Sequence, residues 1–94
     1  MIYYTRTQIV EILGLEDGFV VSLEREDIIS SDAPQGAAGE FSEQMLERAR
    51  VAANLVGELE VNLPGAAIIV RMREEMADLR RQMAQLLEQF ERDA

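Results

Sequence analysis

The sequence contains no cysteine, no histidine, no tryptophan and no lysine. Without cysteine, the chain can form neither a disulfide nor a thiolate metal site. Without cysteine or histidine, the usual zinc ligands, a thiol nucleophile and a Ser-His triad are all excluded. No stretch approaches 18 apolar residues, and the first residues lack the basic-then-apolar pattern of a secretion signal. We therefore expect a cytoplasmic protein that is not an enzyme and uses no metal, cofactor or small-molecule substrate.

Acidic residues outnumber basic residues in the sequence. The chain contains nine positive residues, all arginine, and 18 Asp and Glu residues, which gives a net charge of −9. Residues 1–63 hold 12 acidic residues and four arginines (net −8), whereas 64–94 hold six and five (net −1). An acidic surface repels nucleic acid and anionic membranes and favours a basic protein partner. With 94 residues, the chain has room for one small domain and an additional helix.

A regular apolar stripe runs along the C-terminal third. Its members are separated by alternating steps of three and four residues: Ile69, Met72, Met76, Leu79, Met83, Leu86 and Phe90. This average spacing of 3.5 keeps one face of a helix toward a partner helix in a supercoil. No Gly or Pro interrupts residues 66–94, Asn62 is a suitable N-cap, and Pro64 fits in a first helical turn. We expect one long helix that joins two copies as a homodimer, with the relative direction of the two helices left open. Packing of the helix on its own domain is the alternative.

The arginines between the stripe positions are expected to pair with neighbouring carboxylates or with a partner helix: Arg71, Arg73, Arg80 and Arg81.

Two short helices are expected near the N-terminus. Thr5 and Gln8 form a capping box at the start of the first helix, and Gly14 ends it. Its apolar side would consist of Ile9, Val10, Ile12 and Leu13. Glu16 and Asp17 place negative charge at the start of the second helix, where the helix dipole favours it. Its inward stripe would consist of Phe19, Val20 and Leu23. Two short helices joined by such a tight turn are typical of a helix-turn-helix.

A small, turn-rich segment follows, over residues 30–39. It lies between the apolar pair Ile28-Ile29 and the pair Glu40-Phe41, which predicts a β-hairpin with two very short strands. Ser42 is a good N-cap for a third helix. The inward stripe of that helix would consist of Leu46, Ala49, Ala53 and Val56, widened by Met45, Ala52 and Leu59.

This order of elements resembles a MerR-type winged helix-turn-helix followed by its dimerisation helix. Three segments follow the spacing of the family motifs YT, LLG and YEREGLI: Tyr4-Thr5, Ile9 to Leu15, and Leu23 to Ile29. The resemblance implies a mainly α fold with a small β-hairpin wing. It divides the chain into an acidic winged helix-turn-helix domain (1–62) and a coiled-coil dimerisation helix (63–94).

The chain departs from the DNA-binding members of that family in its charges. Those members carry basic residues on the second helix and an arginine in the wing. Here residues 16–22 contain no base, and Glu40 precedes Phe41. Because phosphate contacts from Lys and Arg supply most of the non-specific affinity for DNA, this departure argues against a nucleic-acid partner.

The chain also resembles the CbpM-type chaperone modulators, which look like shortened MerR derivatives. The corresponding motifs are Phe41-Ser42-Glu43, Leu63-Pro64-Gly65, and the series Met72, Met76, Leu79. The resemblance implies a regulator of the DnaK chaperone system. Such a regulator binds the J-domain of a DnaJ/CbpA-type co-chaperone and inhibits its action with DnaK.

Acidic residues on the second helix and at its exit are the candidates for contact with a basic J-domain surface: Glu16, Asp17, Glu24, Glu26 and Asp27. Charge complementarity of this kind speeds association and sets specificity. A solvated face that only keeps the protein soluble explains the same residues equally well. Val21 is a further candidate, because it is expected to point outward where DNA-binding relatives carry a base.

Two other functions remain as alternatives. One is a MerR-like transcription regulator, although the lack of basic residues on the second helix and in the wing argues against it. The other is a non-enzymatic coiled-coil adaptor, in which the long helix alone would bind the partner.

Overall fold

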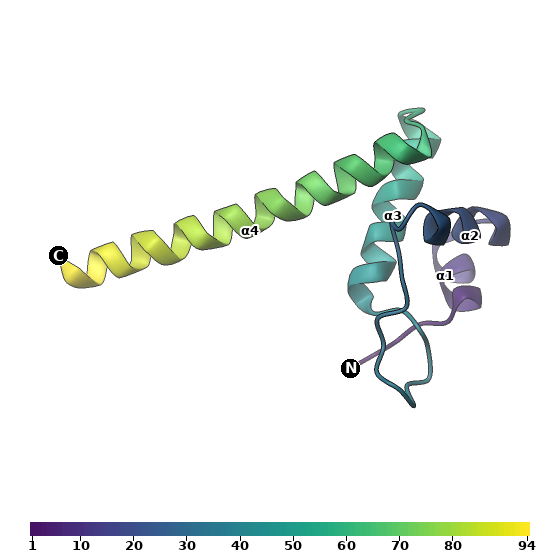
Figure 1. Cartoon of the computed structure of the whole chain (residues 1–94), viewed down its shortest axis with the longest axis horizontal. Helices are drawn as coiled ribbons and strands as arrows, with labels where there is room; N and C mark the ends of the chain where they lie inside the picture. Colours follow the sequence, from purple (N-terminus) through teal and green to yellow (C-terminus); the bar gives the residue numbers. More distant parts are fainter.

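The computed structural model describes all 94 residues and contains four helices and no β-strand (Figure 1). They are α1 (Arg6–Leu13), α2 (Asp17–Arg25), α3 (Glu43–Glu58) and α4 (Leu63–Asp93). Helices α1 and α2 lie on one side of α3, whereas most of α4 extends away on the other side. The molecule therefore measures 55 × 36 × 19 Å. No helix is both long and apolar enough to cross a membrane.

The helix ends follow the local chemistry of the sequence. At α1 the capping box is complete: the Gln8 amide donates to Thr5 Oγ1, and the Thr5 amide donates to Gln8 Oε1. Gly14 ends this helix in the left-handed region, with φ of 65°. Ser42 caps α3, and the Asn62 side chain caps α4 by accepting from the Gly65 amide at 2.8 Å. The predicted caps of α1, α3 and α4 are confirmed.

The hydrophobic core joins all four helices and the loop that follows α2. Its largest fully buried side chains are Phe41, Ile9, Leu23, Ile29 and Val20. Helix α3 contributes Met45, Leu46, Ala49 and Ala52, and α4 contributes Ala66 and Val70. The first two turns of α4 thus pack into the same core as the helix-turn-helix, and only the rest of the helix stands free.

The predicted β-hairpin wing is wrong. Residues 30–40 form an irregular loop, and the single β-bridge joins Tyr4 to Phe41. The Tyr4 amide donates to the Phe41 carbonyl at 2.7 Å, and the Phe41 amide donates back to the Tyr4 carbonyl at 3.0 Å. The amides of Ile28 and Ile29 donate instead to the Leu23 carbonyl at the end of α2. Across the loop itself, only the amides of Asp32 and Ala33 donate to the Glu40 carbonyl, at 3.0 and 3.2 Å, and no ladder of paired strands forms.

The loop is held at its base by side chains. Asp32 accepts hydrogen bonds from both the amide (2.8 Å) and the hydroxyl (2.5 Å) of Ser42, the N-cap of α3. Gly39 lies directly against the N-terminal segment. A Cβ at this position would come within 2.4 Å of the Tyr4 backbone, so only glycine fits here without a shift of the backbone.

Two residues expected in the core are exposed. Ile12 is 52% exposed, because α2 and α3 cover only the side of α1 that carries Ile9, Val10 and Leu13. Leu59 is 68% exposed, because α3 ends at Glu58 and Leu59 already belongs to the turn toward α4.

Candidate protein-interaction surfaces

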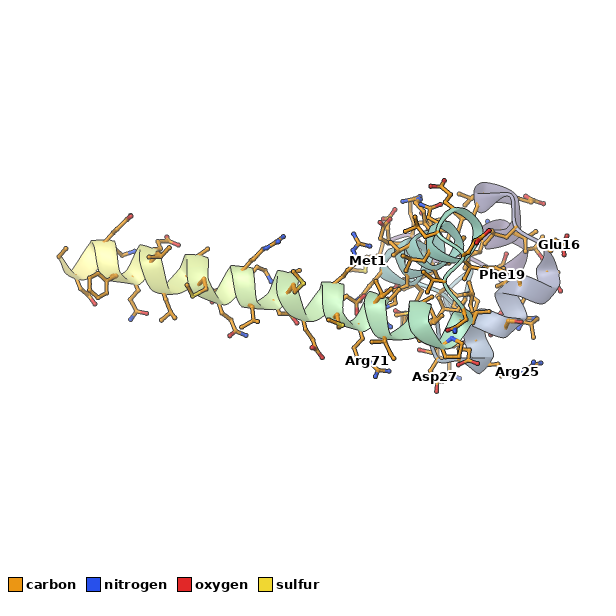
Figure 2. The ribbon with its side chains drawn as sticks, turned by 90° about the horizontal axis from the view of Figure 1, so that it is seen from above. Met1, Glu16, Phe19, Arg25, Asp27 and Arg71 are labelled. Atoms are coloured by element: carbon orange, nitrogen blue, oxygen red, sulfur yellow. The ribbon has the colours of Figure 1, made fainter.

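The first candidate surface is the start of α2. Glu16 is the N-cap and Asp17 the first helical residue, and both are exposed. Neither carboxylate forms an ion pair or a side-chain hydrogen bond within the chain. Glu16 lies at the end of the domain that is farthest from the free part of α4 (Figure 2). These two charges are therefore fully available to a partner.

Glu24 differs from the other acidic candidates because an arginine of α1 neutralises it. Its Oε2 accepts from Arg6 Nη2 at 2.7 Å and from Arg6 Nε at 2.9 Å. The Glu24 side chain is only 26% exposed. This pair fastens α1 to α2, so Glu24 contributes more to the helix-turn-helix than to an outer acidic face.

Glu26 and Asp27 lie in the turn that follows α2, and both are exposed. Asp27 has φ of 57°, a left-handed conformation that Asp adopts more readily than most residues. Arg25, the last residue of α2, is the only base on this helix. Figure 2 shows Arg25 and Asp27 along the same edge of the domain. The exit of α2 therefore has mixed charge, whereas its start is purely acidic.

The face of α2 between these ends is small and uncharged. Val21 is half-buried, and the Ser22 hydroxyl donates to the Gly18 carbonyl at 3.0 Å. A Cβ added to Gly18 would meet nothing within 4 Å. A helical glycine costs about 1 kcal/mol relative to alanine. Packing inside the chain does not require a glycine at this position.

The second candidate surface is the apolar stripe of α4. Ile69 is half-buried near the domain, and the following stripe residues are between 50% and 79% exposed: Met72, Met76, Leu79, Met83, Leu86 and Phe90. Leu87 lies beside the stripe and is 61% exposed. In Figure 2 the side chains of this part of the helix project into solvent on all sides. Nothing in the chain itself covers the stripe.

A groove of about 370 Å³ lies where α3 and α4 diverge. Its apolar lining comes from Val51 on α3 and from Val70, Met76 and Ala77 on α4. Arg73 and Arg80 also line it, and neither forms an ion pair within the chain. The groove lining therefore combines four apolar side chains with two unpaired arginines of α4, and Glu47, which pairs with Arg50, also lines it.

A two-armed ion pair between α3 and α4 also lines this groove. Arg48 on α3 donates from Nε and Nη2 to the two carboxylate oxygens of Glu74 on α4, at 2.7 and 2.6 Å. These hydrogen bonds lower the pKa of the Glu74 carboxyl and raise the pKa of the Arg48 guanidinium. The two residues are 26 positions apart, so the sequence alone did not suggest the pair. No group of three or more potential metal ligands occurs in the structure.

Residues 4–88 match the family described as MerR HTH family regulatory proteins. No curated protein and no solved structure matches the chain.

Proposed function

Because the chain belongs to the MerR HTH family of regulatory proteins, we propose that it is a regulator whose helix-turn-helix binds a protein instead of DNA. Specifically, we propose a CbpM-type chaperone modulator. It binds the J-domain of a DnaJ/CbpA-like co-chaperone and inhibits the action of that co-chaperone with DnaK. The sequence motifs around Phe41, Pro64 and Met72 support this assignment by their resemblance to that family.

The observation that carries the proposal is the charge of α2. In a helix-turn-helix that binds DNA, the second helix enters the major groove and the surrounding surface contacts phosphates. In this chain that helix begins with two free carboxylates, at Glu16 and Asp17, and its one base is Arg25 at the far end. Carboxylates at the start of the helix would repel the phosphate backbone, whereas they would attract a basic protein helix.

We also propose that the protein acts as a homodimer joined through the stripe of α4. Six apolar side chains that are at least half exposed form a surface that isolated proteins seldom leave open to water. The 3.5-residue spacing of the stripe suits a second helix of the same kind.

Calorimetric titration with an isolated J-domain at low salt tests the function. We expect binding at micromolar concentration, weakening as salt is added because the contact is electrostatic. The double variant Glu16→Gln/Asp17→Asn should weaken binding at least about tenfold. A matched control, Glu58→Gln/Glu60→Gln, makes the same change in net charge at exposed residues at the end of α3 and should leave the affinity nearly unchanged. Absence of binding by the unmodified protein would refute the proposal.

The family match also supports a second candidate function, a transcription regulator. Retardation of duplex DNA at low salt separates the two. DNA binding that survives Glu16→Gln/Asp17→Asn, together with no response to the J-domain, would favour the transcription regulator.

A further inference from the structure

We propose that the cleft between residues 1–3 and the start of α3 binds an extended segment of a partner protein, in which arginine or lysine alternates with apolar residues. This N-terminal cleft has a volume of about 400 Å³, and its lining includes Ile2, Tyr3, Asp32 and Glu43. Clefts of this size are large enough to hold a ligand. The inference does not rest on the function proposed for α2, because it concerns a different surface of the domain.

The N-terminal cleft lies away from the start of α2. Figure 1 shows the N-terminus beside the loop and the first turn of α3, whereas α2 lies on the other side of the domain. Figure 2 likewise shows Met1 and Glu16 on opposite sides of the domain. A segment bound in the cleft and a partner helix bound at the start of α2 would therefore not compete for the same space.

Unpaired backbone groups in the N-terminal segment favour an extended occupant. Tyr4 and Phe41 exchange both of their backbone hydrogen bonds. In an antiparallel pair the next residue whose amide and carbonyl face the same way is Ile2, and its partner would be Glu43. Glu43 already belongs to α3, and the amide and carbonyl of Ile2 form no hydrogen bond within the chain. An extended peptide can pair with these groups, whereas a helix uses its backbone groups internally.

The apolar side chains of this segment are exposed although its backbone is held in place by the hydrogen bonds of Tyr4. Ile2 is 66% exposed, and Met1 is fully exposed. The Tyr3 hydroxyl donates to Met1 Sδ at 3.3 Å, so these two side chains lie together. A second hollow, of about 560 Å³, separates the segment from the uncharged loop residues 34–38. Alternate side chains of a bound strand therefore find apolar surface beside the segment.

The charged residues that line the N-terminal cleft are all acidic. Asp32 accepts hydrogen bonds only from the N-cap residue of α3, and Glu43 accepts one from the Tyr4 hydroxyl at 3.3 Å. These donors are neutral, and neither carboxylate forms an ion pair. The charge of Asp32 helps to raise the pKa of Arg48, but the Arg48 guanidinium is bound to Glu74. The cleft therefore suits a basic segment, because complementary charge sets specificity.

The tyrosines of the chain allow a direct test. The sequence has no tryptophan, and its two tyrosines are Tyr3, which lines the cleft, and Tyr4, which is bound to Glu43. Tyrosine fluorescence of the full chain therefore reports binding at this place. The probe is a short peptide without aromatic residues in which arginine and valine alternate. At about 150 mM salt, which screens non-specific attraction, we expect a saturable change in fluorescence. A peptide with serine in place of valine should bind at least about tenfold more weakly.

Two substitutions with matched controls locate the bound peptide. Ile2→Ser and Glu43→Gln should each weaken binding at least about threefold. Ile12→Ser and Glu58→Gln make the same changes at exposed residues of α1 and α3 and should leave the affinity unchanged. Far-UV circular dichroism checks that each variant is folded. The comparison of the two peptides needs no variant, so it decides the question even where a substitution unfolds the chain.

Binding that calorimetry detects without a change in tyrosine fluorescence would place the peptide elsewhere and overturn the inference. Equal affinity for the valine and serine peptides, or equal weakening by Glu43→Gln and Glu58→Gln, would reveal only a general attraction to an acidic protein and would also overturn it. So would the lack of a saturable response up to about 1 mM peptide. Glu16→Gln/Asp17→Asn should bind the peptide normally, and a loss of binding would assign the peptide to α2 instead. Failure of J-domain binding would not change any of these results, so the two proposals are tested separately.

Discussion

Replacing Gly39 by alanine should loosen the attachment of the N-terminal segment to the domain. The added Cβ would lie 2.4 Å from the Tyr4 carbonyl carbon and 2.6 Å from its amide nitrogen and carbonyl oxygen. All three atoms belong to the backbone, so no side-chain rotation can relieve the clash. The N-terminal segment must move by about 1 Å to reach ordinary van der Waals contact.

That displacement breaks or stretches three hydrogen bonds. The Tyr4 amide donates to the Phe41 carbonyl at 2.7 Å, and the amides of Glu40 and Phe41 donate to the Tyr4 carbonyl at 3.0 Å. At about 0.5–1.5 kcal/mol for each bond, the loss of all three costs about 1.5–4.5 kcal/mol. The free energy of unfolding expected for a domain of this size is only about 5–14 kcal/mol. Gly39→Ala should therefore remove a large fraction of the stability.

Gly18→Ala is the matched control, because it makes the same chemical change where nothing lies within 4 Å of the new Cβ. It should stabilise α2 by up to about 1 kcal/mol. Urea unfolding followed by far-UV circular dichroism measures both variants. One protein concentration must be used throughout, since dimerisation adds to the apparent stability. The reasoning fails if Gly39→Ala unfolds at the same urea concentration as the unmodified protein, or if Gly18→Ala unfolds earlier.

Two further predictions concern α4. The hydrogen bonds from Arg48 lower the pKa of the Glu74 carboxyl in the folded state. The ion pair therefore stabilises the fold fully above the ordinary carboxyl pKa of 4.5. This stabilisation is lost as the pH falls through the lowered pKa of Glu74. Glu74→Gln should lower the free energy of unfolding by about 1 kcal/mol at neutral pH, and the variant should lose less stability than the unmodified protein as the pH falls. If urea unfolding of the variant depends on pH in the same way as that of the unmodified protein, the ion pair does not have this role. Asn62→Ala should cost about 1 kcal/mol by removing the cap of α4, and equal urea midpoints for Asn62→Ala and the unmodified protein would show that the cap contributes nothing.

The sequence predicted the helices well because their signals are local. The Thr5–Gln8 capping box, Gly14, Ser42 and Asn62 each act on backbone groups within three or four residues. Such contacts depend on nothing but the neighbouring residues, so they can be recognised without knowledge of the fold.

The wing was mispredicted because its outcome depends on a distant segment. The pairs Ile28-Ile29 and Glu40-Phe41 have the composition of two short strands. However, the Glu40 and Phe41 amides and the Phe41 carbonyl form hydrogen bonds with Tyr4, which lies 37 residues before Phe41. In the same way, Glu24 looks like its acidic neighbours in the sequence, and only the fold shows that Arg6 neutralises it. Short strands have weak local preferences, and pairing partners decide them.

The crossing of α3 and α4 has a mechanical consequence for the far end of the long helix. Helix α3 contributes the fully buried Ala49 and Ala52 to the common core and α4 contributes the fully buried Ala66, and the Arg48–Glu74 pair bridges the two helices. From Glu74 to Asp93 the helix continues for 19 residues, or about 28 Å. A rotation of ten degrees at the crossing therefore swings the tip by about 5 Å, nearly one helical turn. A small change of angle where α4 leaves the core is therefore enlarged at Phe90, near the far end of the helix.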